Sequence, residues 1–216
     1  MTELNASIRD IPIPWRMASR PISPKGYPVP WFVAWLDGLP DFRVIAPGRI
    51  AQAHKGRLCW LCGQPLGRFM AFTIGPMCAI NRVSAEPPSH RECAEYAAVA
   101  CPFLSQPKMR RNTADMPEEH EPAPGVAIMR NPGVALVWVT KSYKVMRVEN
   151  GALFQVGDPT EVKWFCHGRP ATRVEVMASI SSGLPLLEAE AIKDGPEAVA
   201  ELARYVDRAM PLLPAG

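Results

Sequence analysis

Leu58-Cys59-Trp60-Leu61-Cys62-Gly63 is the most informative segment of the 216-residue sequence. Two cysteines separated by two residues predict a tight turn that directs both thiolates toward one metal ion. The glycine that follows them permits the backbone conformation that such a turn needs. This segment therefore predicts the first half of a metal site.

Ser89-His90-Arg91-Glu92-Cys93 predicts the second half. Ser89 and Glu92 fit the capping-box pattern, so we expect a helix to begin at Ser89. His90 and Cys93 would then share one face of its first turn. A cysteine turn followed by ligands at the start of a helix is typical of treble-clef zinc fingers. We therefore predict that one structural Zn2+ ion is bound by Cys59, Cys62, His90 and Cys93.

The remaining cysteines and histidines leave alternatives for the ligand set. Cys78 can replace His90, and His54 is a weaker substitute. Cys101 follows Cys93 by eight residues, which is about 12 Å along a continuous helix. A Zn–S bond is only about 2.3 Å long, so Cys101 cannot share the ion. Four protein ligands close the coordination shell, whereas catalytic zinc usually keeps a position for water, and the pattern therefore indicates a structural ion.

The other segments of the first half predict short elements. Residues 31–36 and 41–45 are expected to form two strands around a turn, and residues 49–55 a helical turn. Residues 68–74 predict another strand. Residues 76–83 are either its partner or a short helix that begins at Pro76. The first 30 residues contain several prolines and predict extended backbone.

The second half predicts a small antiparallel sheet followed by helices, an α+β layout. Asn150-Gly151 is a strong hairpin signal. Thr172 and Glu175 form a second capping-box pattern, with the helix expected to end at Gly183, and Pro196 is expected to begin another helix. The strands are expected at residues 134–140, 143–148, 152–156 and 162–166.

The polar, proline-rich stretch before this sheet predicts a domain boundary. We expect a zinc-binding domain with a proline-rich N-terminal arm at residues 1–110 and a linker at residues 111–125. An antiparallel sheet plus helices is expected at residues 126–216.

Composition indicates a globular protein, because 48% of the residues are hydrophobic. We expect no secretory signal and no membrane span, and therefore a cytoplasmic protein whose thiols stay reduced. The net charge is +3, but residues 1–111 hold 14 Lys and Arg against 7 Asp and Glu, a local net of +7. This excess is compatible with nucleic-acid binding, and equally with an ordinary solvated surface.

Several residues are candidates for contact with anions or nucleic acid. Helix starts and clustered cations favour phosphate, although ordinary solvated helix ends carry the same residues. The candidates are Lys108, Arg110, Arg111, Arg169 and Arg173. Trp31, Phe32 and Trp35 with Arg43 can stack on bases, but a place in the hydrophobic core is favoured.

Part of the chain resembles a group of uncharacterised phage and bacterial zinc-knuckle proteins. The resemblance covers roughly residues 26–111 and implies a prokaryotic or viral setting without an activity. It is carried by Gly26-Tyr-Pro-Val-Pro-Trp-Phe32, Cys59-Trp-Leu-Cys-Gly63, Gly75-Pro76, Glu86-Pro-Pro-Ser-His90, Cys93-Ala94 and Cys101-Pro-Phe-Leu104.

The sequence thus favours a zinc-stabilised, non-enzymatic binding protein that acts on nucleic acid or a host protein. A second hypothesis is an enzyme acting on a nucleotide or nucleic acid, with a site between the halves that uses Arg169, Arg173 and His167. Cys166 beside His167 does not make a nucleophilic pair, because adjacency supplies neither a positioned base nor an orienting group. A third hypothesis is a protein-directed inhibitor or modulator.

Overall fold

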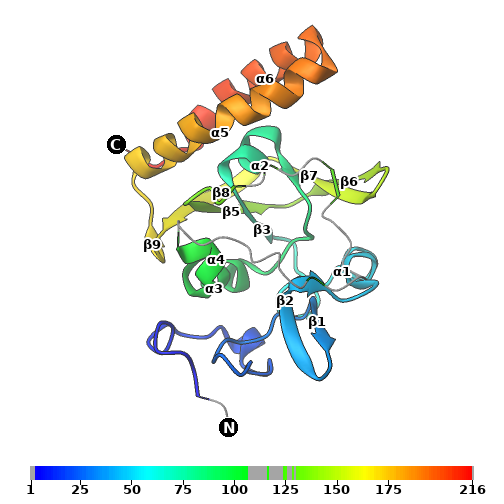
Figure 1. Ribbon diagram of the computed structural model, residues 1–216, viewed down its shortest axis with the longest axis vertical. Coiled ribbons are helices and arrows are strands. Elements are labelled where there is room, and N and C mark those ends of the chain that lie inside the picture. Colours follow the sequence, from blue (N-terminus) through cyan, green and yellow to red (C-terminus); the bar gives the residue numbers. More distant parts are fainter. Residues whose placement is uncertain (1–2, 107–115, 117–123, 126–127, 129, 216) are drawn as a thin grey trace.

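A computed structural model describes residues 3–106, 116, 124–125, 128 and 130–215 of the chain (Figure 1). Most of the predicted linker at residues 111–125 lies outside these residues, and so do Lys108, Arg110 and Arg111. The described part combines helices with antiparallel sheets, which confirms the predicted α+β class.

The first part of the chain forms short elements joined by proline-containing loops. Residues 3–32 run mostly without regular structure, apart from the 3-10 turn η1 (Trp15–Met17). A two-stranded antiparallel hairpin follows, made of β1 (Val33–Leu36) and β2 (Leu39–Ile45), and then α1 (Arg49–Gly56). The predicted strand pair and the predicted helical turn at residues 49–55 are both confirmed.

The central sheet has the strand order β3-β5-β8-β9. Its strands are β3 (Met70–Ile74), β5 (Ala135–Thr140), β8 (Pro159–Cys166) and β9 (Arg169–Pro170). Every residue of β5 is buried, because the strand lies inside the sheet and both of its faces are covered. A strand buried on both faces is apolar rather than alternating, as residues 135–139 are, and only Thr140 at its end is polar.

Helices cover the two faces of this sheet. On one face, α3 (Arg91–Ala100) packs its alanines against Val137 and Val139. On the other face, Leu136 and Trp138 contact a larger core with α2 (Pro76–Asn81), α5 (Arg173–Asp194) and α6 (Pro196–Ala209). The short helix α4 (Pro102–Ser105) follows α3, and η2 (Met210–Leu212) ends the described helices. Figure 1 shows α5 and α6 as a helical hairpin at the end of the molecule opposite the N-terminal arm.

A second sheet has the order β4-β7-β6. The strands β6 (Tyr143–Val148) and β7 (Gly151–Val156) form the hairpin predicted from Asn150-Gly151. The short strand β4 (Val83–Ser84) pairs with β7, and β3 pairs with β5. Segments on both sides of the predicted linker therefore contribute strands to the same two sheets. The segment at residues 76–83 forms the short helix α2 rather than the partner of β3.

The capping box of α5 is confirmed, since Thr172 Oγ1 accepts a hydrogen bond from the Glu175 N–H and the Glu175 carboxylate accepts one from the Thr172 N–H. The predicted end of this helix at Gly183 is wrong, because α5 continues to Asp194. A Cβ at position 183 would lie 3.0 Å from Met77 Sδ and 3.1 Å from Arg130 Nη1. Glycine here allows close packing within the helix instead of ending it. The start of α6 at Pro196 is confirmed.

Within the described residues, none of the helices has both the length and the apolar character required to cross a membrane.

Candidate metal centre

The first pair of candidate ligands lies on a tight turn between Leu58 and Pro65, which form an isolated antiparallel bridge. Two backbone hydrogen bonds close the turn, from the Cys59 N–H to the Gln64 carbonyl and from the Gly63 N–H to the Cys59 carbonyl, each 2.8 Å long. Gly63 has a φ of +78°, and a Cβ there would lie 2.5 Å from the Trp31 ring. Only glycine fits this position, as the sequence predicts.

The second pair lies where the chain enters α3. The predicted capping box at Ser89 and Glu92 is wrong, because helix α3 begins at Arg91 and His90 is its N-cap residue. Ser89 instead pairs with Ala71 through two backbone hydrogen bonds of 2.7 and 2.8 Å, which hold it extended. Glu92 turns outward and accepts a 2.9 Å hydrogen bond from Arg16.

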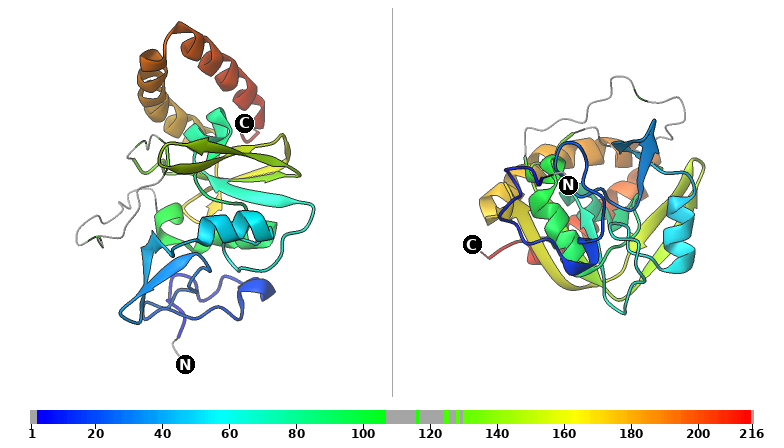
Figure 2. Two further views of the ribbon diagram at one scale, coloured as in Figure 1. Left: turned by 90° about the vertical axis from the view of Figure 1, so that its right-hand side faces the viewer. Right: turned by 90° about the horizontal axis from the view of Figure 1, so that it is seen from below.

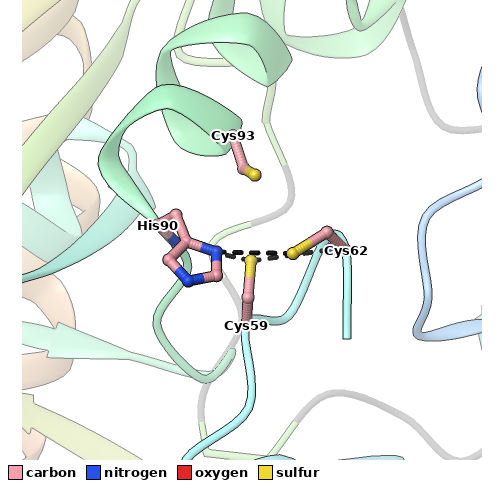
Figure 3. A group of neighbouring side chains, drawn as sticks. All are labelled: Cys59, Cys62, His90 and Cys93. Carbon is pink, nitrogen blue, oxygen red and sulfur yellow. Dashed lines mark hydrogen bonds between the residues drawn. The ribbon is translucent and has the colours of Figure 1, made fainter. Parts of the chain in front are cut away.

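These two segments bring four ligand atoms together. Figure 3 shows the turn side chains facing His90 and Cys93 at the start of α3. Their ligand atoms all lie within 4.8 Å of one another, and all four side chains are buried. One metal ion can therefore be held by the predicted set of Cys59, Cys62, His90 and Cys93.

Hydrogen bonding orients the imidazole of His90 toward the sulfurs. Its Nε2 lies 3.0 Å from the Pro65 carbonyl oxygen, and its Nδ1 lies 3.3 Å from Cys62 Sγ. A carbonyl only accepts, so the neutral ring carries its proton on Nε2 and presents the Nδ1 lone pair to the cluster. This arrangement is the usual way in which a backbone carbonyl fixes the tautomer of a metal-binding histidine.

The same centre is electrostatically prepared for a cation. Cys59 Sγ accepts hydrogen bonds from the backbone N–H groups of His90 at 3.3 Å and of Cys62 at 3.5 Å. Burial acts to raise the pKa of the Cys59 thiol, but hydrogen bonds from Cys62, Cys93 and His90 lower it well below its ordinary value. Hydrogen bonds to Cys59 and Cys62 raise the pKa of the Cys93 thiol.

The pKa of His90 is affected by the same contacts. Burial lowers it, but hydrogen bonds to Cys59 and Cys62 outweigh burial and raise it to about 10. Hydrogen-bonding protons thus link the four side chains. A bound divalent cation would replace those protons.

The alternative ligands lie elsewhere. Cys78 is exposed on α2, and Cys101 follows the end of α3, so neither belongs to the cluster. His54 Nδ1 lies 3.1 Å from the hydroxyl of Tyr143 on β6. Of the open choices for the ligand set, the structure favours His90.

The N-terminal arm (residues 3–30) covers this centre, which the sequence did not indicate. Ile8 and Met17 are buried in a small core with three of the ligand cysteines, Tyr96 and Leu61. Arg16 fastens the arm by donating hydrogen bonds to Glu92 at 2.9 Å and to Gln64 at 3.1 Å. The right-hand view of Figure 2 shows the molecule from below, with the arm lying on the side that faces the viewer. The irregular spacing of its apolar residues carries no helical or strand signal.

The predicted anion site at the start of α5 is occupied by internal contacts. Arg169 makes a two-pronged ion pair with Glu175, with N–O distances of 2.6 and 3.0 Å. Arg173 donates to the Pro214 carbonyl at 3.1 Å. The two arginines therefore bind different groups of the protein and do not form one common anion site.

A groove of about 340 Å³ beside α5 is lined by His167 and Cys166, among others. Burial and nearby Glu175 raise the pKa of the Cys166 thiol, and this thiol lies 3.3 Å from the Gly133 carbonyl oxygen. A thiol with a raised pKa is a poor nucleophile. Cys166 is therefore not an activated nucleophile in this groove.

The aromatic residues near β1 divide between core and surface. Phe32 stacks on buried Trp60, with ring centroids 4.7 Å apart, and Arg49 lies 4.1 Å above the Trp31 ring. Arg43 pairs with Asp41 at 2.6 Å, while Trp35 is exposed. No stacking platform is formed by these four predicted residues together.

A different group of exposed cations was missed from the sequence. Lys141 lies 5.4 Å from the ring of exposed Phe69, Arg68 precedes Phe69 in the chain, and Arg57 contacts the Gly67 carbonyl in the same loop. For Arg57 and Arg68, the usable signal was the absence of any Asp or Glu between Asp41 and Glu86.

No family model matches the chain, and no significantly similar curated protein or solved structure was found. The resemblance to phage and bacterial zinc-knuckle proteins stays a prediction. The chain is characterised by an α+β fold with a buried Cys3His cluster that can hold a metal ion.

Proposed function

We propose that the protein is a zinc-stabilised, non-enzymatic binding protein that contacts nucleic acid. Three thiolates and one imidazole are a preferred ligand set of structural zinc. The four donors are buried. Four protein ligands would fill a tetrahedral shell and would leave no position for a substrate or water. The proposed ion therefore supports the fold and takes no part in a reaction.

We also propose that the first half is a treble-clef-like unit. The support is the order of its parts: the Cys59–Cys62 turn, the pairing of Ala71 with Ser89, and a helix whose start carries His90 and Cys93. Helix α2 and strand β4 are inserted between the two paired residues. Three reduced thiols at one centre suit a reducing compartment, so we place the protein in the cytoplasm.

The observation that carries the nucleic-acid proposal is the charge of residues 42–85. This segment contains six Lys and Arg and no Asp or Glu. Arg43 and Arg82 pair with acidic side chains from outside it, but Arg57 and Arg68 stay exposed without an acidic partner in the described chain. A group of unneutralised cations attracts a polyanion.

Two measurements on the full chain test this proposal. Mass spectrometry of the purified protein is expected to find one zinc per chain. Filter binding to nucleic acid is expected to weaken steeply between about 50 mM and about 200 mM salt, because bound phosphates release counterions. The absence of binding at the lower salt concentration would reject the nucleic-acid proposal while leaving the zinc proposal standing.

A second candidate function, binding of a protein partner, has its own observation. The β1–β2 hairpin exposes Trp35, Leu39 and Phe42 and pairs with no third strand of the described chain. Exposed apolar patches of this kind are common at protein interfaces. A chain that contains zinc but binds no nucleic acid at low salt would favour this candidate.

A further inference from the structure

An exposed aromatic ring lies at the start of β3. Phe69 is 51% exposed, although the next residue, Met70, is fully buried in the core. Met70 pairs with Thr140 on β5, so Phe69 reaches the turn that follows β5. There the ammonium of Lys141 lies 5.4 Å from the centroid of the Phe69 ring.

Arg57 contacts the loop that leads to this ring. Its Nη2 donates to the Gly67 carbonyl at 3.3 Å and approaches Met70 Sδ at 3.9 Å. The Arg57 carbonyl accepts a 2.7 Å hydrogen bond from the Leu66 N–H. Arg57 is thereby held with its guanidinium at the edge of the Phe69 loop, and Arg68 is exposed immediately before Phe69.

These three cations form no ion pairs, unlike several others in the described chain. In the described part of the molecule, no acidic side chain lies within ion-pair distance of Arg57, Arg68 or Lys141. Seven other cations do have acidic partners, namely Arg16, Arg43, Arg82, Arg91, Lys163, Arg169 and Lys193. The Phe69 surface, defined as Arg57, Arg68, Phe69 and Lys141, therefore carries unneutralised positive charge.

The metal centre helps to position this surface. The loop from Gly63 to Phe69 begins at the ligand turn, and its Pro65 carbonyl lies 3.0 Å from His90 Nε2. Its other end is fixed by the pairing of β3 with β5. The loop is thus anchored on both sides, which reduces the entropy that a ligand would have to remove on binding.

We infer that the Phe69 surface binds single-stranded nucleic acid, with a base stacked on Phe69 and the adjacent phosphates neutralised by Arg57, Arg68 and Lys141. This inference rests on the proposed function and assigns it to one surface. Sequence-tolerant proteins for single strands combine exposed aromatic rings with cations along the backbone. In a duplex the base faces are covered by their neighbours, so a flat exposed ring has little to stack on.

The test is a titration of the zinc-loaded full chain with fluorescein-labelled oligothymidylate, followed by anisotropy. Phe69→Ala is expected to weaken binding between about fivefold and about 150-fold, the range for loss of one stacked base. It should leave the salt dependence unchanged, because no phosphate contact is removed. Phe69→Trp should retain binding.

The cations give a different signature. Each neutralised phosphate contributes about −0.7 to the slope of log affinity against log salt for single strands. Arg57→Gln, Arg68→Gln and Lys141→Gln are each expected to make that slope shallower by about this amount. Phe42→Ala is the matched control, since Phe42 is 43% exposed on the β1–β2 hairpin and should leave binding unchanged.

The outcomes separate the two proposals. If the wild-type chain binds oligothymidylate and Phe69→Ala binds equally well, the inference about this surface is rejected and the proposed function survives. Equal or tighter binding of a duplex, or full competition by polyglutamate, also overturns it. If the wild-type chain binds no nucleic acid, both proposals fall. Circular dichroism and zinc content check that each variant is folded.

Discussion

Removal of the proposed zinc is expected to release the N-terminal arm. Three ligand cysteines belong to the small core that holds the arm. The eight buried residues of this core are Ile8, Met17, Cys59, Leu61, Cys62, Cys93, Tyr96 and Ala100. Without an ion, the buried ligand groups of this core have only hydrogen bonds to one another and to backbone N–H groups. Removal of the metal also removes the binding free energy that stabilises the fold.

The expected loss of stability is comparable to the entire stability of a domain. Structural zinc contributes an apparent binding free energy of about 10–16 kcal/mol in zinc-finger peptides. Whole domains are stable by only about 5–15 kcal/mol. The metal-free first half should therefore be largely unfolded at room temperature, and Ile8 and Met17 should leave their positions.

Limited trypsin digestion measures this release. Arg16, whose side chain donates hydrogen bonds to Glu92 and Gln64, should resist cleavage in the zinc-loaded chain. Chelation should make the Arg16–Met17 bond rapidly cleavable, and added zinc should restore protection. Cys78→Ser is the control, because Cys78 lies outside the cluster. Continued protection of Arg16 in chelated, metal-free protein would refute this reasoning.

Three other predictions address separate parts of the chain. Zinc affinity should fall as pH decreases, because the cysteines and His90, whose pKa is raised to about 10, must lose protons to bind the ion. Competition with a chromophoric chelator at several pH values measures this affinity. A zinc affinity that does not change with pH would exclude these ligands. Gly63→Ala should lower zinc content and melting temperature, since its Cβ would lie 2.5 Å from the Trp31 ring, whereas Gly38→Ala, with nothing within 4 Å of its Cβ, is the control for a positive φ. Hydrogen bonds from Arg169 and the Thr172 N–H hold the pKa of Glu175 below its ordinary value. Glu175 should therefore stabilise the fold at pH values above the ordinary Glu pKa of about 4.3, and this stabilisation should be lost as pH falls. The melting-temperature difference between wild type and Glu175→Gln should shrink in acid, and a difference independent of pH would contradict this.

The candidate site was predictable because its information is local. The spacing of Cys59 and Cys62 and the glycine after them specify a turn within six residues. His90 and Cys93 are likewise separated by only two residues, so their spacing is also local information. The capping box at Ser89 was predicted wrongly because the backbone of Ser89 pairs with Ala71, eighteen positions earlier. A local pattern cannot reveal that competing partner.

Long-range features account for what the sequence left open. β3 was expected as a strand, but its partner β5 lies more than sixty residues further along the chain. Gly183 resembles a helix end in isolation, and its actual role depends on Met77 and Arg130. Likewise, Ile8 and Met17 have no periodic neighbours, and only their packing on the ligand cysteines reveals their role.

The pairing of β3 with β5 has a consequence for synthesis on the ribosome. All four ligand residues emerge before residue 94, so the metal centre can assemble while the rest of the chain is still being translated. β3 then presents an open edge, with Phe72 and Ile74 uncovered, until residues 135–140 have left the exit tunnel. An uncovered strand edge is prone to pair with other chains. The nascent protein should therefore be most vulnerable to aggregation in the interval between these two events, and ribosome pausing there should lower the yield of folded protein.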